Sequence, residues 1–122
     1  ATERRARARR DEVQARRFIQ ETATRVVQQV LSVLRFEGFS CSLSTPAGSV
    51  RIEFDKHHED FIDLAVDPTR DPVTIMTVVS RLHGKSVATT EWPLADGVEL
   101  EQLTDEHVLA FLLSALPGFV AR

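Results

Sequence analysis

Apolar residues recur every three or four positions in the first third of the chain. This spacing places them along one face of an α-helix, and the series is Ile19, Ala23, Val26, Val27, Val30, Leu31 and Leu34. Neither Pro nor Gly interrupts residues 1–37. We therefore predict one long helix over 8–36, ended by Gly38, because glycine readily adopts the left-handed conformation that often follows a helix.

Between residues 40 and 92 the pattern changes to an alternation of apolar and polar positions, which is typical of half-buried strands. The segment 73–82 is apolar on both faces and rich in Val, Ile and Thr, as expected for a central strand. We predict five strands, namely a short one around Cys41 and Leu43, then 50–55, 62–66, 73–82 and 86–92.

Short links between these segments indicate antiparallel pairing, because parallel strands need long crossovers. The last two strands are predicted to form a hairpin with a two-residue loop, either His83-Gly84 or Gly84-Lys85. The first choice places Ile75 opposite Trp92, and we prefer it because it pairs apolar residues.

A second helix is predicted near the end of the chain. Thr104 has the side chain of an N-cap, and the two acids after it suit the positive end of the helix dipole. Leu116-Pro117-Gly118 is expected to end the helix, and the tail after it to fold back onto the body. The apolar residues of this region cover more than one face, and they are Val108, Leu109, Phe111, Leu112, Leu113, Leu116, Phe119 and Val120.

The predicted order of helix, five strands and helix favours a two-layer α+β sandwich, in which both helices cover one face of an antiparallel sheet. The other face carries Arg51, Glu53, Asp55 and Asp63 and is expected to be wet. A helix over 8–36 spans roughly 43 Å, whereas the strands span only about 17–27 Å. Its polar N-terminal part should therefore extend beyond the sheet.

The chain has 122 residues, of which 43% are hydrophobic, so one domain can bury its own core. Residues 1–17 carry seven arginines against three acids, a net charge of +4, and the total charge of −3 leaves −7 on the remainder. We divide the chain into a basic arm, 1–17, and a single α+β domain, 18–122. The overall charge excludes a broadly basic nucleic-acid coat.

The N-terminus lacks an apolar signal-peptide core, and the longest apolar run, 108–113, is far shorter than the roughly 20 residues of a membrane span. A single cysteine, Cys41, excludes an internal disulfide and suits a reducing compartment. We expect a cytoplasmic protein of bacterial origin, with no cofactor.

The basic arm has two interpretations. As a phosphate-binding arm it would use Arg4, Arg5, Arg9 and Arg10. As a solvated helix it would form charge pairs four residues apart, which are Glu3–Arg7, Arg7–Asp11, Glu12–Arg16 and Glu21–Arg25.

A loop in the acidic segment is a candidate metal site, because imidazole and carboxylate groups bind divalent metals. The candidates are His57, His58, Asp60 and Asp63. The alternative is a solvated hairpin loop, since adjacent histidines in a loop tend to point in different directions.

No motif indicates nucleophilic catalysis, and Cys41 between two serines has the character of a small packing residue. We lean against an enzyme and predict a non-catalytic protein–protein interaction module, adaptor or chaperone-like, that forms a homodimer. Its partner-binding residues are predicted to be Phe111, Leu112, Leu116 and Phe119. The alternatives are a nucleic-acid-binding protein that uses the arm and a metal-binding domain at 55–63.

Overall fold

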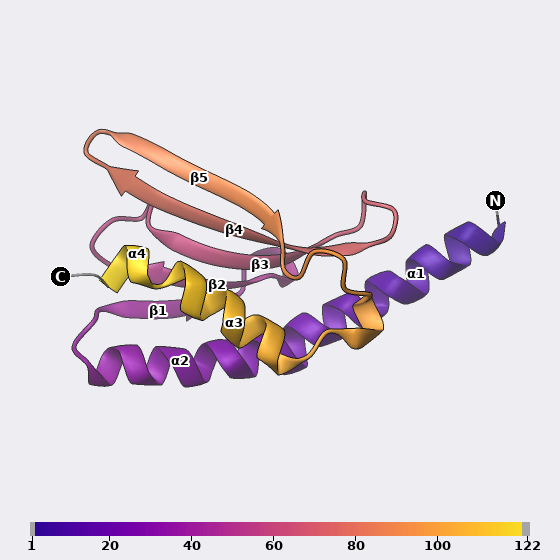
Figure 1. Cartoon of the computed structure of the whole chain (residues 1–122), viewed down its shortest axis with the longest axis horizontal. Coiled ribbons are helices and arrows are strands. Elements are labelled where there is room, and N and C mark those ends of the chain that lie inside the picture. The colour runs from indigo at the N-terminus through magenta and orange to yellow at the C-terminus, as the bar shows by residue number, and fades with distance from the viewer. Residues whose placement is uncertain (1, 121–122) are drawn as a thin grey trace.

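One long helical rod, a five-stranded sheet and a shorter C-terminal helix make up the chain in a computed structural model that describes residues 2–120 (Figure 1). The helical elements are α1 (Thr2–Arg17), η1 (Phe18–Ala23), α2 (Thr24–Phe36), η2 (Pro46–Gly48), η3 (Leu100–Gln102), α3 (Asp105–Ala115) and α4 (Pro117–Val120). The strands are β1 (Cys41–Ser44), β2 (Val50–Phe54), β3 (Phe61–Asp67), β4 (Thr74–His83) and β5 (Ser86–Pro93). The predicted α+β class and element order are confirmed.

The rod is one continuous helix from Thr2 to Phe36, so it begins before the predicted residue 8. Its buried positions advance in steps of four, through Ala15, Ile19, Ala23, Val27 and Leu31. In a regular α-helix each such step rotates the side chain by about 40° away from the previous one. The six residues of η1 form a π-helix, whose wider turn slows this rotation and keeps the line of buried residues on the sheet.

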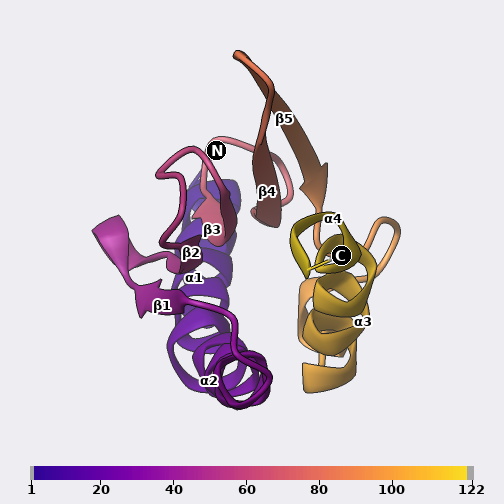
Figure 2. The same ribbon diagram turned by 90° about the vertical axis from the view of Figure 1, so that its left-hand side faces the viewer.

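The five strands pair in the order β1-β2-β3-β4-β5, and every pair is antiparallel. Figure 2 shows both helices on one face of the sheet, with the rod below β1–β3 and α3 beside β4. The core lies between these layers, and its fully buried large side chains are Ile19, Val27, Val50, Ile52, Ile62, Leu64, Val108 and Leu112.

The preferred hairpin register was wrong. His83 pairs with Ser86, so the loop is Gly84-Lys85, and Trp92 lies opposite Thr77. Gly84 has a φ of +59° at the first loop position, a conformation that glycine adopts without steric cost. The rule of pairing apolar residues did not apply, because β5 is exposed from Ser86 to Trp92 and such pairs would bury little surface there.

The outer face of the sheet is less wet than predicted. Asp55 is exposed, but Asp63 is only 7% exposed and forms an ion pair with Arg51 at 3.4 Å. The Arg51 guanidinium also lies over the ring of Phe61, 4.1 Å from its centroid. These side chains cover one another, and Met76 beside them is buried as well.

The C-terminal segment packs on the sheet, but it does not fold back after Leu116 as predicted, because Leu116 is helical and α4 continues directly from α3 (Figure 1). Thr104 caps α3, and the ring of His107 accepts a hydrogen bond from the Thr104 backbone N–H at 3.0 Å, which completes a capping box. From Pro117 the chain forms α4, where the ring of Phe119 stacks on Phe54 with a centroid distance of 4.5 Å. This contact joins the end of the described chain to the core.

The N-terminal part of the rod extends beyond the sheet, as the difference in length predicts (Figure 1). Ala15 is the buried residue of α1, whereas Val13 is 59% exposed. The rod is therefore anchored by its second half, and its first half presents its side chains to solvent.

Replacing Leu112 by Ala should lower the free energy of unfolding by about 2–5 kcal/mol, because a side chain with no exposed surface leaves a cavity. The neighbouring Leu113→Ala variant is the matched control, since Leu113 is 61% exposed, and its change should stay within about 0.5 kcal/mol. Urea unfolding followed by circular dichroism measures both. Equal losses in the two variants would contradict the packing described here.

Candidate functional site

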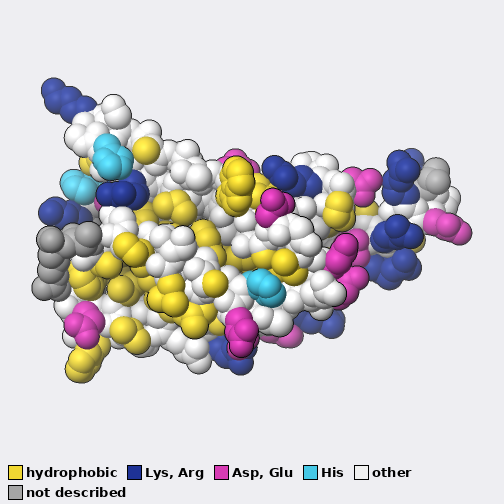
Figure 3. Space-filling view, viewed as in Figure 1, with side chains coloured by type: hydrophobic (Ala, Val, Ile, Leu, Met, Phe, Trp, Pro, Cys, Tyr) yellow, Lys and Arg dark blue, Asp and Glu magenta, His cyan; other side chains and the backbone are white. Residues whose placement is uncertain are grey.

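The exposed side of the helix layer carries an unusual amount of apolar surface. Val33 of α2 and Leu113 of α3 are each 61% exposed, and Leu109 is 41% exposed. Together with Val30, which is half-buried between them, these residues form what we call the helix-layer patch. Figure 3 shows hydrophobic side chains gathering over this region. Contiguous apolar surface of this kind commonly marks an interaction site.

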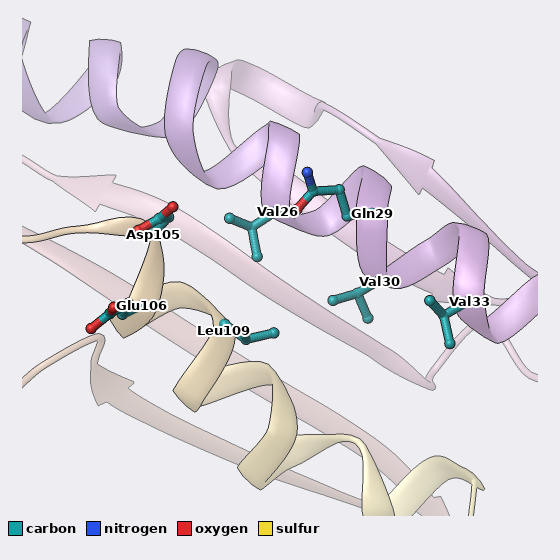
Figure 4. A pocket seen from close by; sticks show the side chains of 7 residues that line it. All are labelled: Val26, Gln29, Val30, Val33, Asp105, Glu106 and Leu109. Carbon is teal, nitrogen blue, oxygen red and sulfur yellow. The ribbon is translucent and has the colours of Figure 1, made fainter.

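A groove of about 280 Å³ runs between α2 and α3 through this patch. In Figure 4, Val26 and Val30 project from α2 toward Leu109 on α3, and Asp105 and Glu106 stand at one end. The valine side chains are short, so they leave space between the two helices that longer side chains would fill. The apolar floor of the groove is Val26, which is 5% exposed and belongs to the core.

One end of the groove carries acidic side chains. The residues lining it include Asp105 and Glu106 and no basic side chain. Asp105 lies 3.7 Å from Arg25, which offsets part of its charge from outside the lining, whereas Glu106 has no ion-pair partner in the described chain. The groove is therefore apolar along its length and negative where α3 begins.

The structure separates the four predicted partner-binding residues from this surface. Leu112 is 0% exposed and Leu116 is 7% exposed, so both belong to the core. Phe119 is half-buried against Phe54, and Phe111 is half-buried at the edge of the core. Leu112 of α3 and Leu116, the residue just after it, lie four positions apart, so both side chains lie on the side of the helix that packs into the core.

The apolar residues that α3 exposes are Leu109 and Leu113. They also lie four apart, and they share a face with the acidic start of the helix. Periodicity could not distinguish them from the buried pair, because α3 is apolar on several sides. The distinguishing signal was the neighbouring α2, whose exposed Val33 indicates which side of the helix layer stays open.

A second, larger groove of about 700 Å³ lies between the β4–β5 hairpin and the C-terminal helices. Thr77, Val79 and Trp92 line it from the sheet, and Phe111 and Ser114 line it from α3. Trp92 is 63% exposed at its mouth. We call this the hairpin groove, and its wide opening follows from β5 standing clear of α3 (Figure 2).

The first part of the basic arm is exposed, and its four candidate arginines all face solvent. Within residues 2–120, the structure gives no ion-pair partner to the four candidates for phosphate binding, which are Arg4, Arg5, Arg9 and Arg10. Figure 3 shows their end of the molecule as a cluster of basic side chains.

One of the four predicted charge pairs along the helix is formed, between Arg16 and Glu12 at 2.9 Å. The other three are not among the ion pairs of residues 2–120, and Arg25 lies next to Asp105 instead of Glu21. Contacts between helices thus replace part of the expected pairing within the helix.

The candidate metal residues do not converge. Asp60 accepts a hydrogen bond from the Leu82 backbone N–H at 2.7 Å, and Asp63 is engaged by Arg51. His57 is exposed, and His58 lies 3.4 Å from Glu59. Over residues 2–120 there is no group of three or more His, Cys, Asp or Glu side chains placed to hold a metal ion.

Cys41 is enclosed at the start of β1, with 4% of its surface exposed. Burial raises the pKa of its thiol, and the nearby Arg35 guanidinium offsets part of this shift. The thiol therefore stays protonated at neutral pH, which disfavours a role as nucleophile.

No helix within residues 2–120 combines the length and the apolar character required to cross a membrane. Comparison with protein-family models, curated proteins and solved structures gave no significant match to this chain.

Cys41 should react slowly with a disulfide reagent such as Ellman's reagent in the native protein and fast in denaturant, because the native thiol is both covered and held protonated. The raised pKa also means that this group's contribution to stability is present below its ordinary pKa and is lost as the pH rises through the native value. Absorbance at neutral pH measures the rate. Native labelling as fast as that of the denatured chain would contradict this environment.

Proposed function

We propose that the protein is a non-catalytic protein-interaction module that binds an amphipathic helix of another protein on the helix-layer patch. The observation that carries this proposal is that Val33 and Leu109 are exposed in one groove between two helices, with Leu113 exposed four residues after Leu109 on α3. Leaving large apolar side chains in water costs about 25 cal/mol for each Å² of apolar surface, and a docked partner removes that cost.

A helix is the partner that suits the shape of the groove. Two helices side by side leave a trough into which a third helix inserts residues spaced three, four and seven positions apart. The lining is Val and Leu with one amide, Gln29, so the matching face should be aliphatic.

The charge of the groove adds a second requirement. Asp105 and Glu106 stand at one end without a basic residue among the groove's lining. A partner helix with Lys or Arg at the corresponding end would complement them and set its direction in the groove.

A synthetic amphipathic helix of about 16 residues, with Leu at heptad positions a and d and Lys on the remaining surface, tests this binding mode. Fluorescence anisotropy should show tighter binding than for a scrambled peptide of the same composition. Leu113→Glu and Val33→Glu should each weaken binding about tenfold or more, since a carboxylate then faces apolar side chains.

Gln28→Glu is the matched control for the added charge, because Gln28 is exposed on α2 and does not line the groove. This variant should bind like the wild type. Equal affinity for the amphipathic and scrambled peptides, or equal affinity of all variants, would reject the helix-layer patch as a docking site.

A second function is favoured by the exposed arm. Four arginines without ion-pair partners in the described chain, on a projecting helix, suit a nucleic-acid phosphate backbone. Such contacts are sequence-independent and weaken steeply with salt.

For this function, Arg9→Gln together with Arg10→Gln should reduce the affinity for duplex DNA. The fall of log affinity with log salt should also become shallower, by about two in the slope. The control is Lys56→Gln with Arg70→Gln, which removes the same charge from exposed positions of the domain. A mobility-shift titration over a salt series measures both variants. The absence of wild-type binding at low salt, or an equal loss in the control, excludes the arm as a nucleic-acid site.

A further inference from the structure

The outer edge of β5 is open and unprotected. β5 pairs with β4 alone, and its register runs from Ser86 to Pro93 without a bulge. Its charged residue is Glu91, its proline comes last, and its positions from Ser86 to Trp92 are all exposed. Proteins usually shield such edges with short strands, lysines, prolines, bulges or a covering helix, because an open edge is a template for another strand.

The opposite edge of the sheet is a useful contrast. β1 has four residues, against eight in β5, and it is followed directly by the turn at Pro46–Gly48. A short strand offers few hydrogen-bonding groups to a newcomer. The free pairing capacity of the sheet is therefore concentrated at β5.

The molecule also exposes more surface than its size requires. Its accessible surface is 7913 Å², whereas a compact monomer of 13.7 kDa is expected to expose about 6600 Å². The excess, roughly 1300 Å², is larger than the roughly 800 Å² that each partner buries in a standard interface. The projecting N-terminal half of the rod and the exposed strand β5 both contribute to this excess, so β5 supplies part of the surface that a second copy can cover.

We propose that β5 pairs in antiparallel fashion with β5 of a second copy of this chain, so that the two sheets become one across a two-fold axis. This interface is separate from the helix-layer patch, and either can be absent without the other.

Backbone directions define which residues make the contact. The Leu94 backbone N–H donates to the Ile75 carbonyl oxygen at 2.9 Å, and the Trp92 carbonyl oxygen accepts from the Thr77 side-chain hydroxyl at 2.7 Å, so both residues direct backbone groups toward β4. Because backbone groups alternate along an antiparallel strand, the intervening Val87, Thr89 and Glu91 direct theirs outward. These three residues are the ones available to the second copy.

Charge selects the register of this pairing. A two-fold axis perpendicular to the sheet keeps the same face of both copies on one side of the joined sheet. Each residue of β5 therefore lies opposite a residue of the second copy whose side chain is on the same face. One such register places Val87 opposite Thr89 and brings Lys85 beside Glu91 of the second copy, at both ends of the ladder. Glu91 and Lys85 are the charged residues of β5 and its turn, and this register pairs both of them.

The same register accounts for Trp92. It places the indole, which is 63% exposed in the single chain, opposite Gly84 of the second copy. Gly84 has no side chain, and nothing described in the chain lies within 4 Å of the position where one would begin. The hairpin tip of one copy can therefore cover the indole of the other.

The experiment is a charge-reversal cycle measured by sedimentation velocity at low salt. Lys85→Glu and Glu91→Lys should each weaken the dimer about tenfold or more, because each places like charges together twice. The double variant should recover to within about threefold of the wild type, since the pairs are restored with reversed sign. Glu101→Lys, an exposed reversal outside the interface, should leave the dimer unchanged.

A second pair of variants tests the edge itself. Thr89→Pro removes an outward N–H and should abolish dimerisation, while Thr89→Ala should not. Circular dichroism confirms that the fold is kept. The chain has a single tryptophan, so its emission should shift to the red on dilution as Trp92 becomes exposed.

Three results would overturn the proposal. The first is a wild type that stays monomeric at millimolar concentration. The second is a dimer that persists in the Thr89→Pro variant. Dissociation of the dimer by Leu113→Glu would count in the same way, because it would place the second copy on the helix-layer patch. The third is a double reversal no tighter than its single variants, which would reject the pairing of Lys85 with Glu91.

Discussion

The structure depends on the burial of one line of side chains on the rod against the inner face of β1–β3. Ile19 and Val27 are almost completely covered there, against strand residues such as Ile52 and Ile62. Because this line occupies the second half of the rod and one side of the sheet, two parts of the molecule remain uncovered. These parts are the N-terminal half of the helix and β5, which add to the surface that the helix-layer patch leaves open.

The α+β class, the strands, the cap at Thr104 and the projecting arm could be predicted from periodicity and turn chemistry, because these signals are local. The register at Gly84 could not be predicted from apolar pairing, since that rule assumes a packed strand and β5 is exposed. The burial of Asp63 was missed because Arg51, from the neighbouring strand, covers it. The π-helical segment leaves no pattern of its own beyond a strict four-residue step.

The candidate site was the part that sequence reasoning reached least well. Leu112 and Leu113 are neighbours of identical type, yet one is fully buried and the other is 61% exposed. Only the position of α2 beside α3 distinguishes them, and that is a tertiary relation. We predicted that the C-terminal helix exposes apolar side chains. In the structure these exposed side chains are Leu109 and Leu113, whereas Leu112 and Leu116 are buried.

The continuity of the rod has a mechanical consequence. Thr2 and Phe36 belong to the same unbroken helix, with the π-helical turn inside it. A flexible linker would leave the position of a bound molecule variable, whereas a continuous helix fixes its distance and direction from the domain. Any molecule bound by the arginines would thus be held at a fixed distance from the sheet. A force on the N-terminal end of the helix would act on its buried part, which includes Ile19.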